Sequence, residues 1–269
     1  MIYNKCYEIF GQCFPELKMD MDTFKELCEI DDCVIFTVKS GDEIIGFSMT
    51  KDNEIRLICV APEYQRKGFG RTLLELAEGA VKDRDKEATA GSPGSRLFIG
   101  APVETAGFFE RFGYRLEGTF AEMAGDTAEL VQPEYEPRGD VRFEFRAANA
   151  EIINAVKEVE DDWAQYFGEG DIFCGVCGDE IASFCIVEEN VTCLLSGDGE
   201  KVGSIGCVGT VPKFRRRGIG LKMVSLAAEE LKKRGCGKIF IHYTHVYDWY
   251  AKLGFKPFLK LKMGGKNLE

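Results

Sequence analysis

Three segments of the first half of the chain recur in the same order in the second half, and this repeat constrains the fold more than any other feature. The matching pairs are 38–47 with 175–184, 60–70 with 210–220, and 109–114 with 250–255. Small length changes separate the copies, around 86–95 in the first and 194–201 in the second. Such a repeat predicts two copies of one domain.

The segment between the copies reads as an exposed linker. It has the sequence QPEYEPRGD at 132–140, with two prolines, a glycine and several charged residues. Few contacts cross segments of this composition, so domain boundaries often fall in them. We therefore predict an N-terminal domain at 1–132, a linker at 133–140 and a C-terminal domain at 141–269.

Strands and helices are predicted to alternate in each copy, which indicates an α/β layered fold. Pro15 is expected to divide the opening helical residues into two helices. The apolar runs 33–38 and 44–49, separated by a Gly-Asp turn, predict a hairpin. Further strands are predicted at 55–60, 96–99, 141–146 and 205–210, and a long helix at 149–166.

A basic, glycine-rich turn follows the apolar strand that ends at Thr210. Three arginines precede Gly218 and Gly220, and a helical pattern of apolar residues comes next. Glycines let the backbone approach a ligand closely, and the unpaired N–H groups and dipole of a helix N-terminus favour an anion. The stretch therefore predicts a site for a pyrophosphate. The alternative is a strand–turn–helix corner with solvated basic residues.

The spacing from Arg215 to Gly220 resembles the R/Q-x-x-G-x-G/A signature of the GNAT N-acetyltransferase superfamily. The resemblance extends over nearly the whole chain, because 65–70 repeats the signature as QRKGFG. It implies two tandem GNAT-type domains, each a mixed, mostly antiparallel sheet flanked by helices, with acetyl-CoA as co-substrate. The residues expected to bind the cofactor are Val208, Gly209, Thr210, Arg215, Arg216, Arg217, Gly218, Ile219, Gly220, Leu221 and Tyr243, and in the first copy Gln65, Arg66, Lys67, Gly68, Phe69 and Gly70.

One residue distinguishes the chemistry of the two copies. Members of the family commonly carry a tyrosine that protonates the departing CoA thiolate, and Tyr250 in YAKLGF matches it. The first copy has Phe109 there, which has no proton to donate. The resemblance thus implies direct acetyl transfer in the C-terminal domain and a catalytically degenerate N-terminal copy. The alternative for Tyr250 is a packed aromatic residue.

The base that deprotonates the amine acceptor is harder to assign. The family often uses a glutamate on the fourth strand, but 203–210 contains no carboxylate. His242 and His245, the two histidines of the chain, follow the fifth predicted strand. Histidine titrates in the required range, so His242 is a candidate catalytic residue. A hydrogen-bonded structural histidine is the alternative.

The net charge and the apolar runs of the sequence limit the binding partners and the cellular location that we expect. The net charge of −11 disfavours nucleic acid and anionic lipid as partners. The first residues lack the apolar core of a signal peptide, and no apolar run reaches the ~18 residues of a membrane span. We expect a cytoplasmic protein whose partner is a small-molecule or peptide amine. The oligomeric state is not defined by the sequence.

Eleven cysteines are scattered along the chain, mostly within apolar strand patterns. This distribution is typical of reduced, buried thiols. Cys174 and Cys177 have the spacing of a zinc knuckle, but a second pair of ligands is missing, so no metal is expected.

Two other interpretations stay open at this point. One is a non-catalytic acyl-CoA-binding or sensing protein, which the missing carboxylate favours and Tyr250 opposes. The other is an aminoacyl-tRNA-dependent transferase, which the net charge opposes. The acidic run at 158–166 lies where related folds border the acceptor pocket. It is either part of that pocket or a solvated helix face.

Overall fold

The computed structural model describes every residue except 1, 31, 83–85, 92–99, 198 and 269. The strand predicted at 96–99 therefore lies outside the described residues. The chain forms two compact units, which we call the first unit (1–121, 192–199 and 259–269) and the second unit (122–191 and 200–258). Each contains a mixed, mostly antiparallel sheet flanked by helices, so the predicted fold class is confirmed.

The first unit begins with the two helices, the hairpin and the strand at 55–60 that the sequence predicts, whereas β4 (Glu87–Ala90) lies where an extra loop was expected. Its strands are ordered β1-β2-β3-β4-β12-β6, where β6 is Arg115–Asp126 and β12 is Lys256–Asn267. β5 lies beside β12, and β3 and β4 run parallel. As expected, Pro15 lies just beyond the end of the first helix. The elements are α1 (Ile2–Cys13), α2 (Met21–Ile30), β1 (Val34–Ser40), β2 (Glu43–Lys51), β3 (Glu54–Val60), η1 (Pro62–Tyr64), α3 (Phe69–Lys82), β4 (Glu87–Ala90), β5 (Ala101–Pro102) and α4 (Gly107–Arg111).

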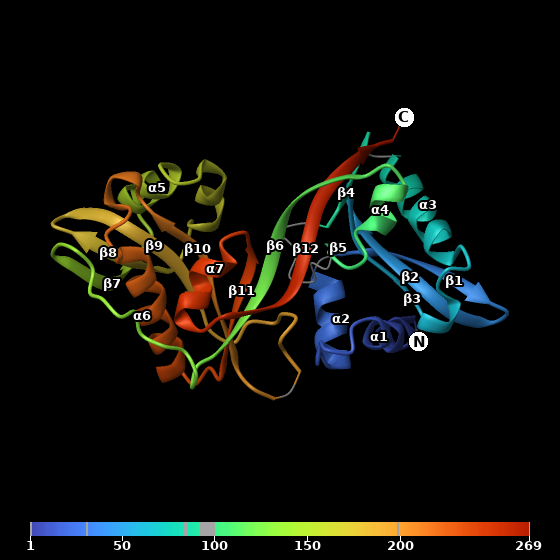
Figure 1. Ribbon diagram of the computed structural model, residues 1–269, viewed down its shortest axis with the longest axis horizontal. Helices are drawn as coiled ribbons and strands as arrows, with labels where there is room; N and C mark the ends of the chain where they lie inside the picture. The colour runs from blue at the N-terminus through green and yellow to red at the C-terminus, as the bar shows by residue number, and fades with distance from the viewer. Residues whose placement is uncertain (1, 31, 83–85, 92–99, 198, 269) are drawn as a thin grey trace. The chain divides into compact units, whose positions relative to one another are not determined.

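Alternate side chains of β2 bury the two faces of this sheet. Phe47 meets Phe24 of α2 at a ring-centroid distance of 6.4 Å. Its neighbour Ser48 donates to the carbonyl of Leu73 in α3 over 3.4 Å. Successive residues of a strand point to opposite faces, so α1 and α2 cover one side of β1–β3 and α3 the other (Figure 1).

The second unit repeats this plan. Its strands are ordered β6-β11-β10-β9-β8-β7, and β10 and β11 run parallel. The elements are β7 (Val141–Ala147), α5 (Ala150–Lys157), η2 (Asp161–Tyr166), β8 (Asp171–Cys177), β9 (Glu180–Glu188), β10 (Val202–Thr210), η3 (Pro212–Phe214), α6 (Ile219–Lys233), β11 (Lys238–Thr244), α7 (Tyr247–Tyr250) and η4 (Ala251–Leu253).

Both faces of this second sheet are covered as well. Phe184 of β9 packs edge-to-face on Phe167, with centroids 5.4 Å apart, on the side of α5 and η2. Gly175 of β8 faces α6, because a side chain placed there would lie 3.3 Å from a methyl group of Ile219. The strands β8–β10 thus lie between α5 and α6 (Figure 1).

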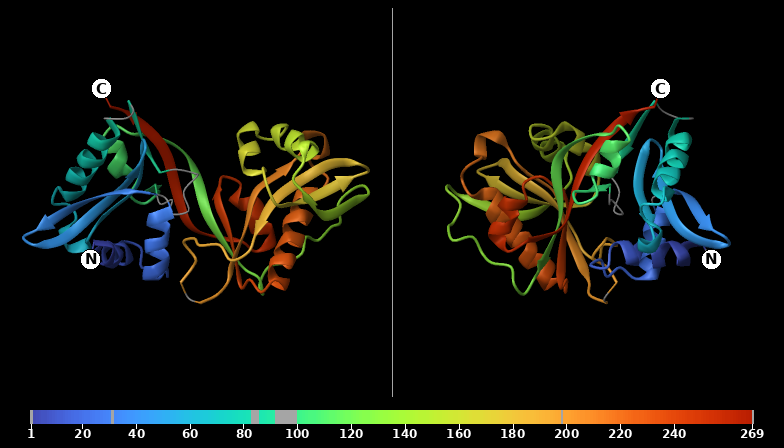
Figure 2. Two further views of the ribbon diagram at one scale, coloured as in Figure 1. Left: turned by 180° about the vertical axis from the view of Figure 1, so that it is seen from behind. Right: turned by 45° about the vertical axis from the view of Figure 1, so that its right-hand side comes forward.

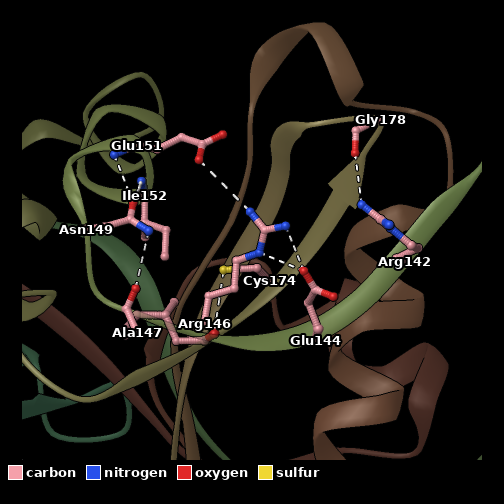
Figure 3. A network of polar contacts seen from close by, with 10 residues as sticks. Arg142, Glu144, Arg146, Ala147, Asn149, Glu151, Ile152, Cys174 and Gly178 are labelled. Atoms are coloured by element: carbon pink, nitrogen blue, oxygen red, sulfur yellow. Dashed lines mark hydrogen bonds and ion pairs between the residues drawn. The ribbon is translucent and has the colours of Figure 1, made fainter.

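The long helix predicted at 149–166 is broken. α5 ends at Lys157, and 161–166 form a 3₁₀ helix. The acidic run EVEDD begins at Glu158, and negative charge is unfavourable at a helix C-terminus, which explains why the helix stops there. At the other end, Asn149 caps α5 by accepting from the N–H groups of Glu151 and Ile152, beside the pair of Arg146 with Glu144 (Figure 3).

Each repeat ends in a long strand that contributes to both units. β6 (Arg115–Asp126) belongs to the first unit up to Ala121 and to the second from Glu122. β12 (Lys256–Asn267) belongs to the second unit up to Phe258 and to the first from Leu259, where it lies between β4 and β6. Figures 1 and 2 show β12 running beside β6.

The insertion near 194–201 also has a structural explanation. Residues 192–199 belong to the first unit, although they lie within the second repeat. Thr192 donates to the carboxylate of Glu26 in α2 over 2.9 Å. Gly197 has a φ of 137° and approaches the backbone of 18–20 so closely that a side chain would overlap it. The extra residues in the second repeat therefore serve the first unit.

Close packing of β12 gives a stability prediction. A side chain at Gly264 would lie 1.8 Å from the carbonyl oxygen of Arg115 in β6. We expect Gly264→Ala to lower the free energy of unfolding by about 1–3 kcal/mol, the usual cost of overpacking. Gly79 of α3 is the matched control, since open space surrounds its Cα and alanine there adds up to ~1 kcal/mol of helix stability. Denaturant unfolding measures both; equal stabilities of the two variants would contradict this packing.

Candidate active site

A β-bulge near the end of β10 is the first feature of the site. The pairing of β10 with β9 runs through Gly206↔Ile186 and resumes at Gly209↔Phe184. Two residues of β10, Cys207 and Val208, thus lie opposite one residue of β9. Cys207 has a φ of 47°, a conformation uncommon outside glycine. Bulges re-aim the backbone and leave the extra residue without a ladder partner, so polar backbone groups become available here.

The strands β10 and β11 separate beside this bulge. Their parallel pairing runs from Val202↔Lys238 to Ser204↔Phe240, and within the described chain it goes no further. The remainder of β10, including the bulge, therefore has a free edge on the side of β11. β10, the fourth strand of the second repeat, thus leaves β11 at this point.

The first unit differs at the same place. Its β3 pairs with β2 residue by residue from Gly46↔Val60 to Met49↔Leu57, the positions that correspond to the bulge of β10. The carbonyl of Val60 accepts hydrogen bonds from Gln65 Nε2 (2.9 Å) and from the Cys13 thiol (3.4 Å). Its backbone is thus more fully paired than that of β10.

The glycine-rich turn has the same backbone in both repeats. Arg216 and Gly218 have φ values of 63° and 82°, and Arg66 and Gly68 have 61° and 94°. The first side chain of each turn folds back onto the preceding strand: Arg215 Nε donates to the carbonyl of Thr210 over 3.0 Å, as Gln65 does to Val60. Local sequence thus produces the predicted corner twice.

The second turn offers more positive charge. Arg215, Arg216 and Arg217 are all exposed, and α6 begins directly after Gly218 without a side-chain cap from any described residue. The first N–H groups of α6 therefore remain available to an anion. The side chains of Ile219 and Leu221 are buried, so only their backbone groups can contact a ligand.

The predicted linker lies against this turn. The N–H of Arg138 donates to the carbonyl of Arg217 over 2.8 Å, and Glu136 pairs with Lys222 of α6 at 2.9 Å. A side chain at Gly218 would meet the ring of Tyr135 at 2.8 Å. The segment 135–138 thus fixes one side of the turn.

Tyr250, the predicted acid, is buried at the C-terminal end of α7 with 5 % of its surface exposed. Its ring packs edge-to-face on Trp249 and Phe255, at 4.9 and 6.0 Å. Burial first, and the nearby thiols of Cys185 and Cys207 next, raise the pKa of Tyr250 above its ordinary value. A phenol in this environment keeps its proton through the neutral range.

Phe109 of the first unit has aromatic surroundings similar to those of Tyr250, with different residues as its packing partners. It is 4 % exposed and packs edge-to-face on Phe108 and Tyr114, both at 5.3 Å. The two units therefore differ here by one hydroxyl group within equivalent packing.

His242, the predicted base, contacts a carboxylate that the sequence did not single out. Its Nδ1 lies 3.0 Å from Oε2 of Glu122, a wholly buried residue of β6. The same oxygen accepts from the N–H of Tyr243 over 3.3 Å. Tyr243 itself has a φ of 47°, and burial raises its pKa to about 12. His245 is exposed.

Among the described residues, the cysteines form neither a disulfide nor a metal-holding group. All eleven are reduced thiols. Cys174 points into the core and donates to the carbonyl of Ile172, and burial raises its pKa to about 12 (Figure 3). Within the described part of the chain, no group of three or more His, Cys, Asp or Glu side chains is placed to hold a metal ion. None of the described helices is long and apolar enough to cross a membrane.

Comparison with known proteins identifies the family. Residues 31–116 match the acetyltransferase (GNAT) domain, and residues 140–255 match the acetyltransferase (GNAT) family. Together the two matches cover well over half of the chain, one in each repeat. The chain belongs to the GNAT acetyltransferases. It is a tandem member, as the repeat predicted, and acetyl-CoA is the co-substrate of this family.

Curated relatives of this GNAT protein match only in part. An amino-acid acetyltransferase of Photorhabdus laumondii is 32 % identical over 83 residues, which are 29 % of this chain and 18 % of the relative. The amino-acid acetyltransferase of Escherichia coli K12 is 28 % identical over the same length, 19 % of its own chain. The match thus spans about a fifth of each curated relative.

Solved GNAT structures match nearly the whole chain. A GCN5-related glucosamine N-acetyltransferase region of a fungal multi-domain GH3 β-N-acetylglucosaminidase gives a TM-score of 0.79 at 20 % identity, covering 96 % of this chain and 36 % of the other. A GCN5-related N-acetyltransferase from Sphaerobacter thermophilus gives 0.71 at 16 %, covering 97 % and 91 %. A tandem GNAT protein of clavulanic acid biosynthesis gives 0.62 at 13 %, covering 97 % and 95 %. These similarities establish the tandem GNAT fold.

Proposed function

We propose that this protein is an acetyl-CoA-dependent N-acetyltransferase that works in its second GNAT unit. The observation that carries the proposal is the difference between the two repeats. The second has a bulged, splayed β10, three exposed arginines before α6, and a tyrosine where the first has Phe109. These are the features that bind the co-substrate and protonate its leaving group.

Different residues of the second unit bind different parts of acetyl-CoA in this proposal. Backbone groups near Val208 to Thr210, on the edge of β10 that does not pair with β11, hold the pantetheine arm. The turn from Arg215 to Leu221 holds the pyrophosphate. Tyr243, the penultimate residue of β11, is assigned to the same cofactor site. The corresponding turn at Gln65–Gly70 is less basic and follows a strand that has no bulge at the equivalent positions. We therefore assign the cofactor to the second turn.

Tyr250 and His242 handle the protons in this proposal. His242 accepts a proton from the acceptor ammonium, which frees the nitrogen lone pair to attack the thioester carbonyl. Tyr250 gives its proton to the sulfur as the carbon–sulfur bond breaks. The phenol regains a proton from the newly acylated nitrogen, and His242 releases its proton to solvent. The products are an N-acetyl amine, free CoA and one proton.

The acceptor proposed here is a small molecule or peptide with a primary amine. The relatives named above act on amino acids and on glucosamine by their names, and both carry such an amine. A panel of amino acids, amino sugars and peptide N-termini therefore makes the first screen. Release of CoA measured with a thiol reagent, together with the mass of the acetylated product, identifies the substrate.

Stoichiometry tests the assignment of the site. Calorimetric titration with acetyl-CoA should give one site per chain, because one turn of the two has a bulged strand and three arginines. Two sites would show that the Gln65–Gly70 turn also binds, and absence of binding at millimolar concentration would overturn the acetyltransferase proposal. Binding without transfer to any amine would favour an acyl-CoA sensor instead.

A further inference from the structure

We propose that Glu122 is the positioning residue of the active site, and that it acts by holding His242 in the tautomer and orientation that a base requires. The inference rests on the function proposed above. Glu122 lies in β6, the strand that closes the first repeat, so the first half of the chain contributes directly to the site of the second unit.

The contacts of one carboxylate oxygen define the tautomer. Oε2 of Glu122 accepts from the N–H of Tyr243 and lies 3.0 Å from Nδ1 of His242. A carboxylate can only accept hydrogen bonds, so Nδ1 must carry the hydrogen of the neutral ring. The lone pair is then on Nε2. This is the arrangement in which a carboxylate orients a catalytic histidine and stabilises its protonated form.

The histidine is partly exposed to solvent, whereas its carboxylate partner is not. Its side chain is 26 % exposed, whereas that of Glu122 is 0 % exposed. The last paired residues of β10 and β11 are Ser204 and Phe240. If this register is continued by two residues, His242 comes level with Gly206, where the bulge of β10 begins. The base thus lies at the level along β10 at which the backbone groups assigned to the thioester arm begin.

The burial of Glu122 is costly and calls for an explanation. Its second oxygen, Oε1, is buried and has no hydrogen-bond partner among the described residues. An unpaired buried acceptor costs on the order of 1–3 kcal/mol. A carboxylate that is buried with only one oxygen satisfied is therefore a poor structural element. Charges placed in this way are concentrated at functional sites.

The first unit has no counterpart of this pair. Counted from the repeated aromatic segments, the position of Glu122 corresponds to Met263 of β12, and that of His242 to Ala101 of β5. In the first unit, the corresponding positions of β12 and β5 thus form strands without a carboxylate or an imidazole. The fold therefore does not need the pair of Glu122 and His242. Because only the second unit has this pair, we infer that it serves catalysis.

Two variants separate the roles of the carboxylate. Glu122→Gln keeps an oxygen that accepts from Tyr243 and His242, because the N–H of Tyr243 orients the amide, but it removes the charge. Glu122→Met introduces the residue found in the first unit and removes the acceptor as well. We expect kcat to fall about tenfold in the first and about 10²-fold in the second. The KM for acetyl-CoA should stay within twofold in both.

Nitrogen NMR gives a readout independent of turnover. The chain has two histidines, so a His245→Asn variant assigns their signals. In the wild type and in Glu122→Gln, His242 should carry its hydrogen on Nδ1. In Glu122→Met the population of the Nδ1-H tautomer should fall, because the acceptor that holds the hydrogen on Nδ1 is gone.

A double-mutant cycle tests whether Glu122 acts through His242. In a His242→Gln background, Glu122→Met should reduce kcat by less than twofold, since the base is already absent. An additive loss of 10²-fold would overturn the proposal, and so would an unchanged tautomer or an unchanged kcat in Glu122→Met. Glu78→Gln is the matched control. It removes another largely buried carboxylate, paired with Lys266 in the first unit, and should alter neither kcat nor the tautomer.

The two proposals fail in different ways. If the wild type acetylates no amine, the acetyltransferase proposal fails, while the NMR comparison still reports whether Glu122 fixes the ring. If the wild type is active and His242→Gln is equally active, the histidine is structural and Glu122 positions no base. Should Glu122→Met not fold, as judged by its thermal transition, Glu122→Gln and the cycle built on it carry the test.

Discussion

Tyr250→Phe is expected to lower kcat for acetyl transfer by about 10²–10⁴-fold, the range of a general acid. The substitution removes one hydroxyl group and leaves the ring between Trp249 and Phe255. The CoA thiolate then has to leave without a positioned proton donor. Binding of acetyl-CoA should be unchanged, because the turn at 215–221 is untouched. Steady-state kinetics and calorimetry measure the two quantities.

The first unit supplies the control for this variant. Phe109→Tyr places the same hydroxyl in equivalent packing and should yield no second active site, because β3 has no bulge at that level. Both variants should unfold within a few degrees of the wild type. A Tyr250→Phe enzyme with full kcat would remove the tyrosine from the mechanism. The raised pKa of Tyr250 also means that the wild-type rate should not decline through loss of this proton below pH ~10.

Arg217→Glu combined with Gly218→Glu is expected to abolish acetyl-CoA binding, a loss on the order of 10²-fold or more in affinity. Two negative charges then replace a cation and an open backbone at the N-terminus of α6. In addition, Gly218 has a φ of 82°, which a glutamate rarely adopts, and the side chain of the introduced glutamate would meet the ring of Tyr135. Calorimetric titration should show no heat of binding at concentrations that saturate the wild type.

The repeated turn provides a matched pair for this experiment. Lys67→Glu with Gly68→Glu makes the equivalent change before α3, where the φ of Gly68 is 94°. We expect this variant to bind acetyl-CoA like the wild type. If Lys67→Glu with Gly68→Glu lost binding while Arg217→Glu with Gly218→Glu kept it, the working site would lie in the first unit instead.

The parts of the fold that depend on local sequence could be predicted. Gly218 and Gly68 occur where the backbone needs positive φ, and Pro15 occurs where α1 has ended, so turn and helix boundaries are evident in the sequence. The duplicated segments by themselves indicate a tandem fold. For the same reason, Tyr250 and Phe109 can be compared directly.

The parts that depend on pairing between distant segments could not be predicted. The bulge at Cys207 is an offset between β10 and β9, and an offset leaves no mark on either strand alone. Glu122 is not evident in the sequence as a site residue, because its partner lies in β11, far along the chain. One signal is present: a lone carboxylate in the apolar stretch Phe120–Ala124 of β6. A buried polar residue in such a run is worth testing as part of a site.

Because β6 and β12 each contribute to both units, this protein cannot be divided simply at its linker. A fragment cut at the linker, 141–269, would lack the strand that pairs with β11, and β12 would extend from it with no sheet to join. Both would present unpaired backbone groups, which promote association between copies. Two such fragments could satisfy each other's edges. The linker is therefore a boundary between the sequence repeats, whereas each compact unit contains residues from both sides of it.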